Sequence, residues 1–111
     1  MCNGASRLEI SAFLEKSKKL VSAGKCEFIP RDKNMQALAK IGLTILDAKE
    51  EILDLKITDY YKGPKKDFDQ PGDIWEFKTM IRGIRFYIKI KVAFVNESEV
   101  LKCIGFHVDE F

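Results

Sequence analysis

The chain has 111 residues, the length of one domain, and we expect residues 1–111 to fold as a single unit. Hydrophobic residues make up 46% of the chain and charged residues 32%, a globular composition that argues against disorder. The formal net charge is only +2, no apolar run approaches the ~18 residues of a membrane span, and the N-terminus lacks the order of a signal peptide, so we expect a cytoplasmic protein with no membrane contact.

Two helices and a short extended segment are predicted first along the chain. Apolar residues at i, i+3 and i+4 spacing predict a helix over Ser6–Ala23. The apolar stretch Cys26–Ile29 ends at Pro30 and is typical of an edge strand or an extended linker. A second, shorter helix is expected over Lys33–Lys40, closed by Gly42.

A third helix has the best local signal. Thr44 followed by Asp47 resembles a capping box at its start. Its buried stripe is expected to consist of Ile45, Ala48, Ile52 and Leu55. The following segment, Thr58–Gly72, is rich in Gly, Pro, Lys and Asp and has no hydrophobic period, so we predict a long loop there. Loops of that length in a small domain are usually functional or disordered.

The rest of the chain is typical of an antiparallel meander. Strands are expected over Ile74–Met80, Ile84–Phe94 and Glu99–His107, with turns at Arg82-Gly83 and Asn96–Ser98. Helices followed by strands predict an α+β fold, in which the N-terminal helices pack on one face of a C-terminal antiparallel β-sheet.

Period-two alternation divides the middle strand between two faces. The core face is expected to carry Phe86, Ile88, Ile90, Val92 and Phe94, and the other face Arg85, Tyr87, Lys89 and Lys91. The last strand alternates less cleanly, but if Phe106 points inward, His107 emerges on the second face. One open surface, overhung by segment 62–66, is therefore expected to gather Glu76, Lys78, Arg85, Tyr87, Lys89 and His107.

Positive charge is concentrated in this half of the chain. Between Tyr60 and Lys91 there are eight Lys or Arg residues and four acidic residues, and from Lys78 to Lys91 five basic residues and no acidic one. Such a block is what a phosphate-binding surface needs. The alternative interpretation is a solvated sheet face, on which Lys62, Lys65 and Lys66 only increase solubility.

The residue types on the expected surface fit the cleavage of RNA. Lys and Arg can stabilise the extra negative charge of a phosphorane, and Glu, His or Tyr can move protons to and from the ribose oxygens. Tyr87 can instead stack on a base. Each residue also has a plainer interpretation, since Glu76 can simply pair with Arg85 or Lys89 across strands and His107 can be a solvated side chain.

Metal-ligating residues are too few and too scattered for a metal centre. Cys2, Cys26 and Cys103 have no metal-like spacing and are expected to be reduced thiols. The single histidine excludes a multi-histidine site, and no Asp/Glu cluster suggests one. We therefore expect no metal and no cofactor.

Several short motifs, in collinear order along nearly the whole chain, resemble the MqsR family of toxins from bacterial type II toxin–antitoxin pairs. The most specific are the segment Lys19-Leu20-Val21-Ser22-Ala23-Gly24 and the segment Tyr87-Ile88-Lys89-Ile90. Others are Asp59-Tyr60-Tyr61-Lys62, Ile74-Trp75 and the closing Gly105-Phe106-His107. The resemblance implies a RelE-like α+β fold, metal-independent cleavage of mRNA, and inhibition by a cognate antitoxin, with the ribosome as a further possible partner.

The resemblance also implies roles for individual residues. The family's active-site lysine matches Lys62, and the tyrosine of its long strand matches Tyr87. Its glutamine after Ile-Trp is Glu76 here, and its near-terminal lysine is His107. Both departures change the proton chemistry, because glutamate exchanges protons and glutamine does not, and because lysine and histidine differ by ~4 units in reference pKa.

These observations lead to a mechanistic hypothesis of transesterification through the 2′-hydroxyl of RNA. Glu76 or Tyr87 is expected to assist deprotonation, His107 to protonate the leaving oxygen, and Lys62, with Arg85 and Lys89, to hold the phosphate. We expect the further RNA-binding residues to be Lys65, Lys66, Lys78 and Arg82, the last of these in a hairpin that resembles a basic hairpin of the family. The competing hypothesis is a non-catalytic module that uses the same basic face to bind nucleic acid or a protein.

Overall fold

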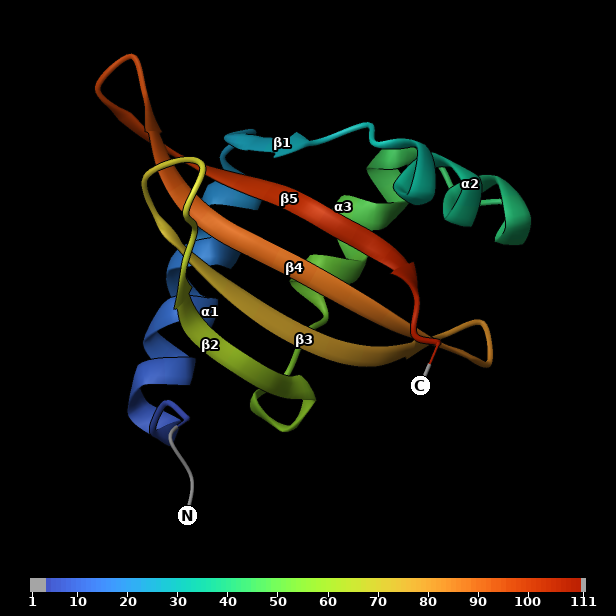
Figure 1. Ribbon diagram of the computed structural model, residues 1–111, viewed down its shortest axis with the longest axis horizontal. Coiled ribbons are helices and arrows are strands. Elements are labelled where there is room, and N and C mark those ends of the chain that lie inside the picture. The colour runs from blue at the N-terminus through green and yellow to red at the C-terminus, as the bar shows by residue number, and fades with distance from the viewer. Residues whose placement is uncertain (1–3, 111) are drawn as a thin grey trace.

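The computed structural model describes residues 4–110. Its elements, in chain order, are α1 (Arg7–Ser22), β1 (Cys26–Phe28), α2 (Asp32–Ile41), α3 (Ile45–Leu53), the 3-10 helix η1 (Ile57–Asp59), β2 (Tyr60–Lys66), β3 (Asp73–Ile81), β4 (Ile84–Val95) and β5 (Ser98–Val108). The strands form one sheet in the order β1-β5-β4-β3-β2 (Figure 1). The predicted α+β class, with helices first and strands last, is confirmed.

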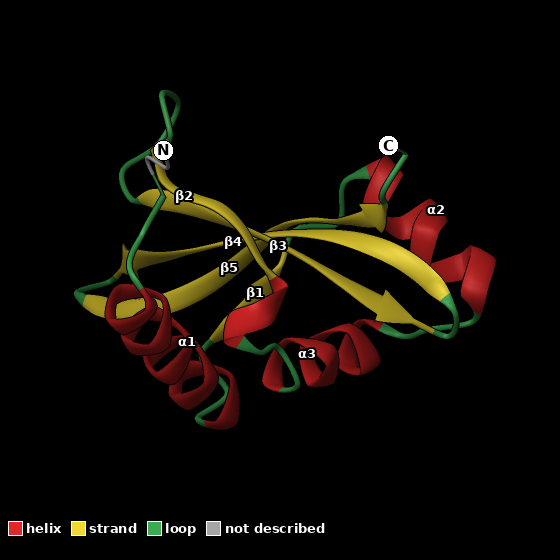
Figure 2. Ribbon diagram, turned by 90° about the horizontal axis from the view of Figure 1, so that it is seen from below, coloured by secondary structure: helices red, strands yellow, loops and turns green. Residues whose placement is uncertain are grey.

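Two of the helices cover one face of the sheet. Seen from the side, α1 and α3 lie beneath the strands, whereas α2 lies beyond one end of the sheet (Figure 2). There α2 packs against β5. Within residues 4–110, the face opposite α1 and α3 carries no helix, and we call it the open face (Figure 2).

All three helices lie where the sequence predicts them, because their ends carry capping signals. Ser6 and Glu9 form a reciprocal capping box at the start of α1, and Thr44 and Asp47 form another at the start of α3. At the end of α2, Gly42 takes the left-handed conformation, with φ 73°, that glycine adopts without strain.

The prediction of a long loop over Thr58–Gly72 is wrong. Tyr60–Lys66 forms β2, which pairs antiparallel with β3 and shifts register twice. Most of its side chains are exposed, so it has no hydrophobic period for the sequence to reveal. What remains of the loop is anchored by Lys91, whose Nζ lies 2.6 Å from an Asp67 carboxylate oxygen and donates to the Pro71 carbonyl.

The predicted antiparallel sheet gains a parallel strand. Residues Cys26–Phe28 form β1, which confirms the edge-strand interpretation of this segment. The strand pairs in parallel with β5, with Cys26 opposite Leu101 and Phe28 opposite Cys103. The sheet is therefore mixed, and the meander of β2 to β5 is its antiparallel part.

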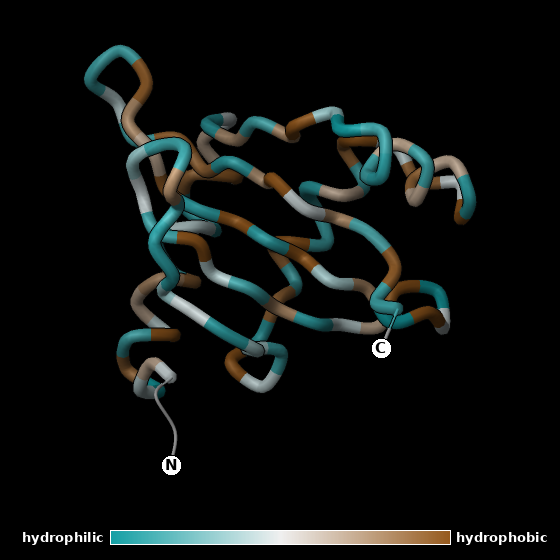
Figure 3. Tube along the Cα trace, viewed as in Figure 1, coloured by the Kyte–Doolittle hydropathy of each residue, from teal (hydrophilic) through white to brown (hydrophobic). Residues whose placement is uncertain are grey.

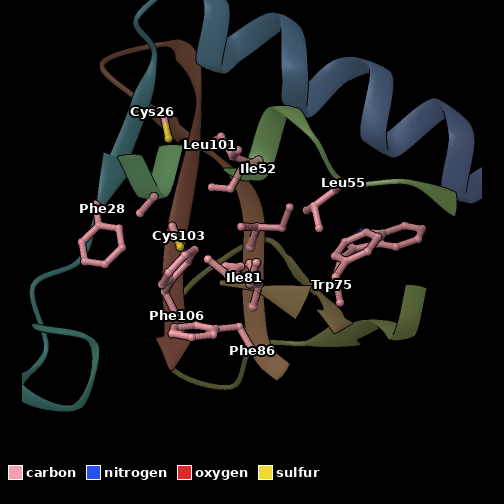
Figure 4. Packing of buried hydrophobic residues seen from close by; sticks show 14 of the residues in the cluster. Cys26, Phe28, Ile52, Leu55, Trp75, Ile81, Phe86, Leu101, Cys103 and Phe106 are labelled. Carbon is pink, nitrogen blue, oxygen red and sulfur yellow. The ribbon is translucent and has the colours of Figure 1, made fainter. Parts of the chain in front are cut away.

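The core lies between the sheet and the helices α1 and α3 (Figure 4). Phe86, Ile88 and Ile90 of β4 are fully buried in it, as predicted. Phe94 was expected beside them but is 74% exposed, because the hairpin of β4 and β5 projects beyond the layer of helices (Figure 1). Ile45, expected in the buried stripe of α3, lies at its first turn and is also exposed.

Two further observations concern thiols and membranes. Cys26 and Cys103 are buried free cysteines, whereas Cys2 lies outside the described residues. Within residues 4–110, no helix has the length and apolar character needed to span a membrane.

Candidate active site

The register of the open face brings the predicted residues of three strands into one row. Lys78 of β3 lies opposite Tyr87 of β4, and Tyr87 lies opposite His107 of β5. Two residues further along, at the next pair on the same face, Glu76 lies opposite Lys89. Hydrophilic and hydrophobic residues alternate along β4 (Figure 3), and because successive side chains of a strand point to opposite faces, the hydrophilic ones reach the open face.

Beside this row lies a buried carboxylate. The side chain of Glu76 is fully buried, its Oε1 accepts a hydrogen bond from the Tyr87 hydroxyl, and its Oε2 lies 2.5 Å from Lys65 Nζ. Lys65 itself is half-exposed and comes from β2, the strand that the sequence did not predict. Both carboxylate oxygens are therefore occupied by donors from neighbouring strands.

These contacts determine which protonation states exist at neutral pH. Burial acts to raise the pKa of Glu76, but the hydrogen bonds from Lys65 and Tyr87 outweigh it and hold the pKa below its usual range. Burial and the neighbouring Glu76 carboxylate raise the pKa of Tyr87 far above its ordinary value. The pair is therefore an ionised carboxylate and a neutral phenol that donates its proton to it.

Lys78 is enclosed by aromatic rings and a carboxylate. Its Nζ lies 4.0 Å from the centroid of the Tyr61 ring and 5.8 Å from that of Tyr87. It also pairs with Asp109, 3.1 Å away, whose side chain is fully buried. Neither Tyr61 nor Asp109 was among the predicted site residues, because Tyr61 belongs to β2 and Asp109 follows the end of β5.

His107 lies beside the pair of Tyr87 and Glu76, with its ring tilted against that of Tyr87. Its ring centroid lies 5.5 Å from that of Tyr87, with 31° between the planes. Its Nδ1 lies 3.1 Å from the carbonyl oxygen of Val108, and because a carbonyl only accepts, this contact requires a proton on Nδ1. Nε2 is then the nitrogen that can exchange a proton with a ligand. Phe106 is fully buried, so the condition on which His107 was predicted to face outward is met.

Three cations surround this row without ion pairs in the described part of the chain: Lys62, Arg85 and Lys89. The Nζ of Lys89 lies 5.6 Å from the Tyr87 ring centroid. Its stem crosses Gly105, where an added Cβ would lie 3.2 Å from Lys89 Cβ and Cγ. Lys62 borders a pocket of about 300 Å³ along β2, which Tyr61 and Lys65 also line. We call these three cations, together with the residues above, the open-face cluster: Tyr61, Lys62, Lys65, Glu76, Lys78, Arg85, Tyr87, Lys89, His107 and Asp109.

Two predicted RNA-binding residues lie outside this cluster. Arg82, in the turn between β3 and β4, donates from Nη1 to the Ile41 carbonyl at the end of α2, 2.6 Å away. It therefore caps a helix rather than facing the row. Lys66, at the end of β2, lies 5.9 Å from the ring centroid of exposed Phe68.

The cluster combines hydrogen-bond donors, an imidazole and cations that form no ion pair with any other described residue, on an accessible surface. A neutral phenol backed by an ionised carboxylate can accept a proton on its oxygen while passing its own to the carboxylate. The imidazole can give or take a proton, and the cations can stabilise a developing anion. Among residues 4–110, no three His, Cys, Asp or Glu side chains gather where they could hold a metal ion.

Comparisons with known proteins do not identify a family for this sequence. Neither a known protein-family model nor a curated protein matches the sequence.

Proposed function

We propose that this chain is a metal-independent endoribonuclease that cuts mRNA by transesterification through the 2′-hydroxyl. The observation that carries the proposal is the hydrogen-bonded pair of Tyr87 and Glu76, which lies beside the His107 ring and beside cations that have no ion pair within residues 4–110. A surface that only binds nucleic acid needs the cations but has no use for a buried carboxylate held against a phenol.

In the proposed reaction Glu76 and Tyr87 have different roles, because they differ in burial. The Glu76 side chain is fully buried, so it does not touch RNA directly and acts as a positioning residue and proton acceptor behind Tyr87. The Tyr87 oxygen takes the proton of the attacking 2′-hydroxyl while its own proton passes to Glu76. The 2′-oxygen then attacks the phosphorus.

His107 completes the proton balance on the other side of the reaction. As an imidazolium it donates a proton to the departing 5′-oxygen, and the products are a 2′,3′-cyclic phosphate and a 5′-hydroxyl. Lys62, Arg85 and Lys89 offset the additional negative charge of the phosphorane between the two steps. Lys65 and Lys78 are held by Glu76 and Asp109, so they shape the site more than they bind phosphate.

The resemblance to MqsR-type toxins supplies the biological setting of the proposal. In that setting the chain has a RelE-like fold, acts in the bacterial cytoplasm on mRNA, alone or at the ribosome, and is held inactive by a cognate antitoxin. A short neighbouring reading frame that encodes a DNA-binding or disordered partner would support this part.

The second candidate is a non-catalytic module that binds nucleic acid or an acidic protein. The observation in its favour is that Lys62, Arg85 and Lys89 have no ion pairs within residues 4–110. Such a module binds RNA with a steep salt dependence and yields no cleavage products.

End-labelled RNA incubated with the protein in EDTA separates the two candidates. We expect cleavage ending in a cyclic phosphate, and a loss of about 10²–10⁴-fold in rate for His107→Ala. Tyr87→Phe removes only the hydroxyl and should also be strongly impaired. Lys40→Ala, which removes an exposed lysine of α2, is the control for charge. RNA that shifts on a gel but stays intact favours the binding module, and cleavage by His107→Ala at the wild-type rate removes His107 from its role.

A further inference from the structure

Strand β5 changes the face it presents partway along its length. Leu101 and Cys103 point into the core in its first half, and Phe106 points into the core in its second half. Since side chains alternate with a period of two, Cys103 and Phe106 can share a face only if one extra residue lies between them. The register shows this extra residue, because Ile90 lies opposite Cys103 whereas its neighbour Lys89 lies opposite Gly105.

The extra residue, Ile104, forms a β-bulge that decides where His107 points. In a regular strand that continued from Cys103, Gly105 and His107 would fall on the core face and Phe106 on the open face. The bulge reverses this, so His107 reaches Tyr87 on the open face. Bulges near active sites commonly redirect a side chain in this way.

One buried side chain, Asn34 of α2, satisfies the backbone groups that flank the bulge. Its Nδ2 donates to the Ile104 carbonyl at 3.2 Å, and its Oδ1 accepts from the Phe106 amide at 2.9 Å. Its Nδ2 also donates to the Ile29 carbonyl, just after β1. Only 1% of Asn34 is exposed, so the amide makes three hydrogen bonds where water does not compete.

We propose that Asn34 is a positioning residue that holds the bulge at Ile104 and thereby keeps His107 on the open face beside Tyr87. An apolar residue of similar size would fill the same volume but leave the Ile104 carbonyl and the Phe106 amide without partners. The placement of His107 stands on geometry alone. Its catalytic consequence rests on the proposed ribonuclease function.

The single histidine of the chain makes the proposal measurable without an activity assay. The two carbon-bound ring protons of His107 give one pair of NMR signals, displaced by the ring current of Tyr87. In Asn34→Leu, which removes all three hydrogen bonds, we expect these signals to move toward the positions of an unstructured histidine. In Asn34→Asp, which keeps the acceptor and loses both donors, we expect a similar movement at neutral pH. Leu38→Ala, which opens a cavity on the same buried face of α2 but keeps the three hydrogen bonds of Asn34, is the matched control and should leave the signals in place.

The same variants separate failure of this proposal from failure of the proposed function. If RNA cleavage by wild type is observed, Asn34→Leu should lower its rate by roughly 10²-fold, the scale expected when a reacting group is displaced by about 1 Å. His107 signals that move in both Asn34 variants and not in Leu38→Ala support the positioning role, even if wild type never cleaves RNA. Signals that stay at their wild-type positions in either folded Asn34 variant, or that move equally in Leu38→Ala, overturn it.

Discussion

Replacing Lys65 by methionine removes the shorter of the two ion pairs described in the open-face cluster. The substitution keeps an unbranched side chain of similar length and removes the ammonium group that lies 2.5 Å from Glu76 Oε2. Glu76 then keeps the hydrogen bond from Tyr87 but has no ion-pair partner. Because its side chain is fully buried, water cannot replace the lost partner freely.

The magnitude lies between two limits. Removing one partner of a fully buried ion pair costs about 3–5 kcal/mol, whereas an exposed pair contributes about 0–1 kcal/mol. Here the carboxylate is buried and the lysine is 48% exposed, so we expect a loss of about 2 kcal/mol in the free energy of unfolding at pH 7. For a domain of this size that corresponds to a fall in Tm of roughly 6–10 °C.

The sign of the pH dependence follows from the pKa of Glu76. In wild type the folded-state pKa lies below its usual range, so the pairing contributes stability above the unfolded-state pKa of ~4.3 and loses it as pH falls through the folded value. Without Lys65, burial raises the pKa of Glu76, and the penalty for the buried charge disappears once the carboxyl is protonated. The difference in stability between wild type and Lys65→Met should therefore be large at pH 7 and small at pH 3.

Thermal unfolding followed by circular dichroism at both pH values measures this difference. Lys62→Met is the matched control, because Lys62 is an exposed lysine of the same strand, with its Nζ 5.1 Å from the Tyr61 ring centroid. It should change the free energy of unfolding by about 0.5 kcal/mol or less. The reasoning is refuted if Lys65→Met is no less stable than Lys62→Met at pH 7, or if its loss persists unchanged at pH 3.

Three further predictions test the fold by equilibrium unfolding in urea. Gly72→Ala should lose about 2 kcal/mol or more, since its φ of 104° is strained for alanine and the new Cβ would lie 2.8 Å from the Val92 carbonyl oxygen; an unchanged midpoint would show that the loop relaxes. Phe94→Ser should cost no more than about 0.5 kcal/mol because Phe94 is largely exposed, whereas Phe86→Ala should cost about 3–5 kcal/mol, and equal losses would place both residues in the core. Thr44→Ala should cost about 1 kcal/mol through the lost cap of α3, and Thr44→Ser should recover most of it if the hydroxyl is responsible.

The elements with strong local signals could be predicted from the sequence. Alternation along β4 placed Tyr87 and Lys89 on one face and Phe86 on the other. Apolar spacing located α1, and the capping box of Thr44 and Asp47 located the start of α3. These features depend on residues close together in the chain, so a single sequence carries them.

The missed features depend on partners far away in the chain. Strand β2 forms because its backbone pairs with that of β3. Most of its side chains are exposed, so its sequence has no hydrophobic periodicity. The sequence predicted that Arg82 binds RNA. In the structure its guanidinium donates to the Ile41 carbonyl, 41 residues away in the chain. The interrupted alternation around Ile104 of β5 was visible in the sequence. The side-chain amide of Asn34 that stabilises the bulge there comes from helix α2, far away in the chain.

The two edges of the sheet also bear on how copies of this chain behave at high concentration. An unpaired strand edge invites another chain to add to it, and long, regular, apolar edges are the most prone to aggregation. One edge here is β1, only three residues long. The other, β2, is interrupted by two register shifts and by Pro64, which has no N–H to donate, and it carries three lysines. The strand that supplies Lys62 and Lys65 to the cluster is therefore also a poor template for edge-to-edge association.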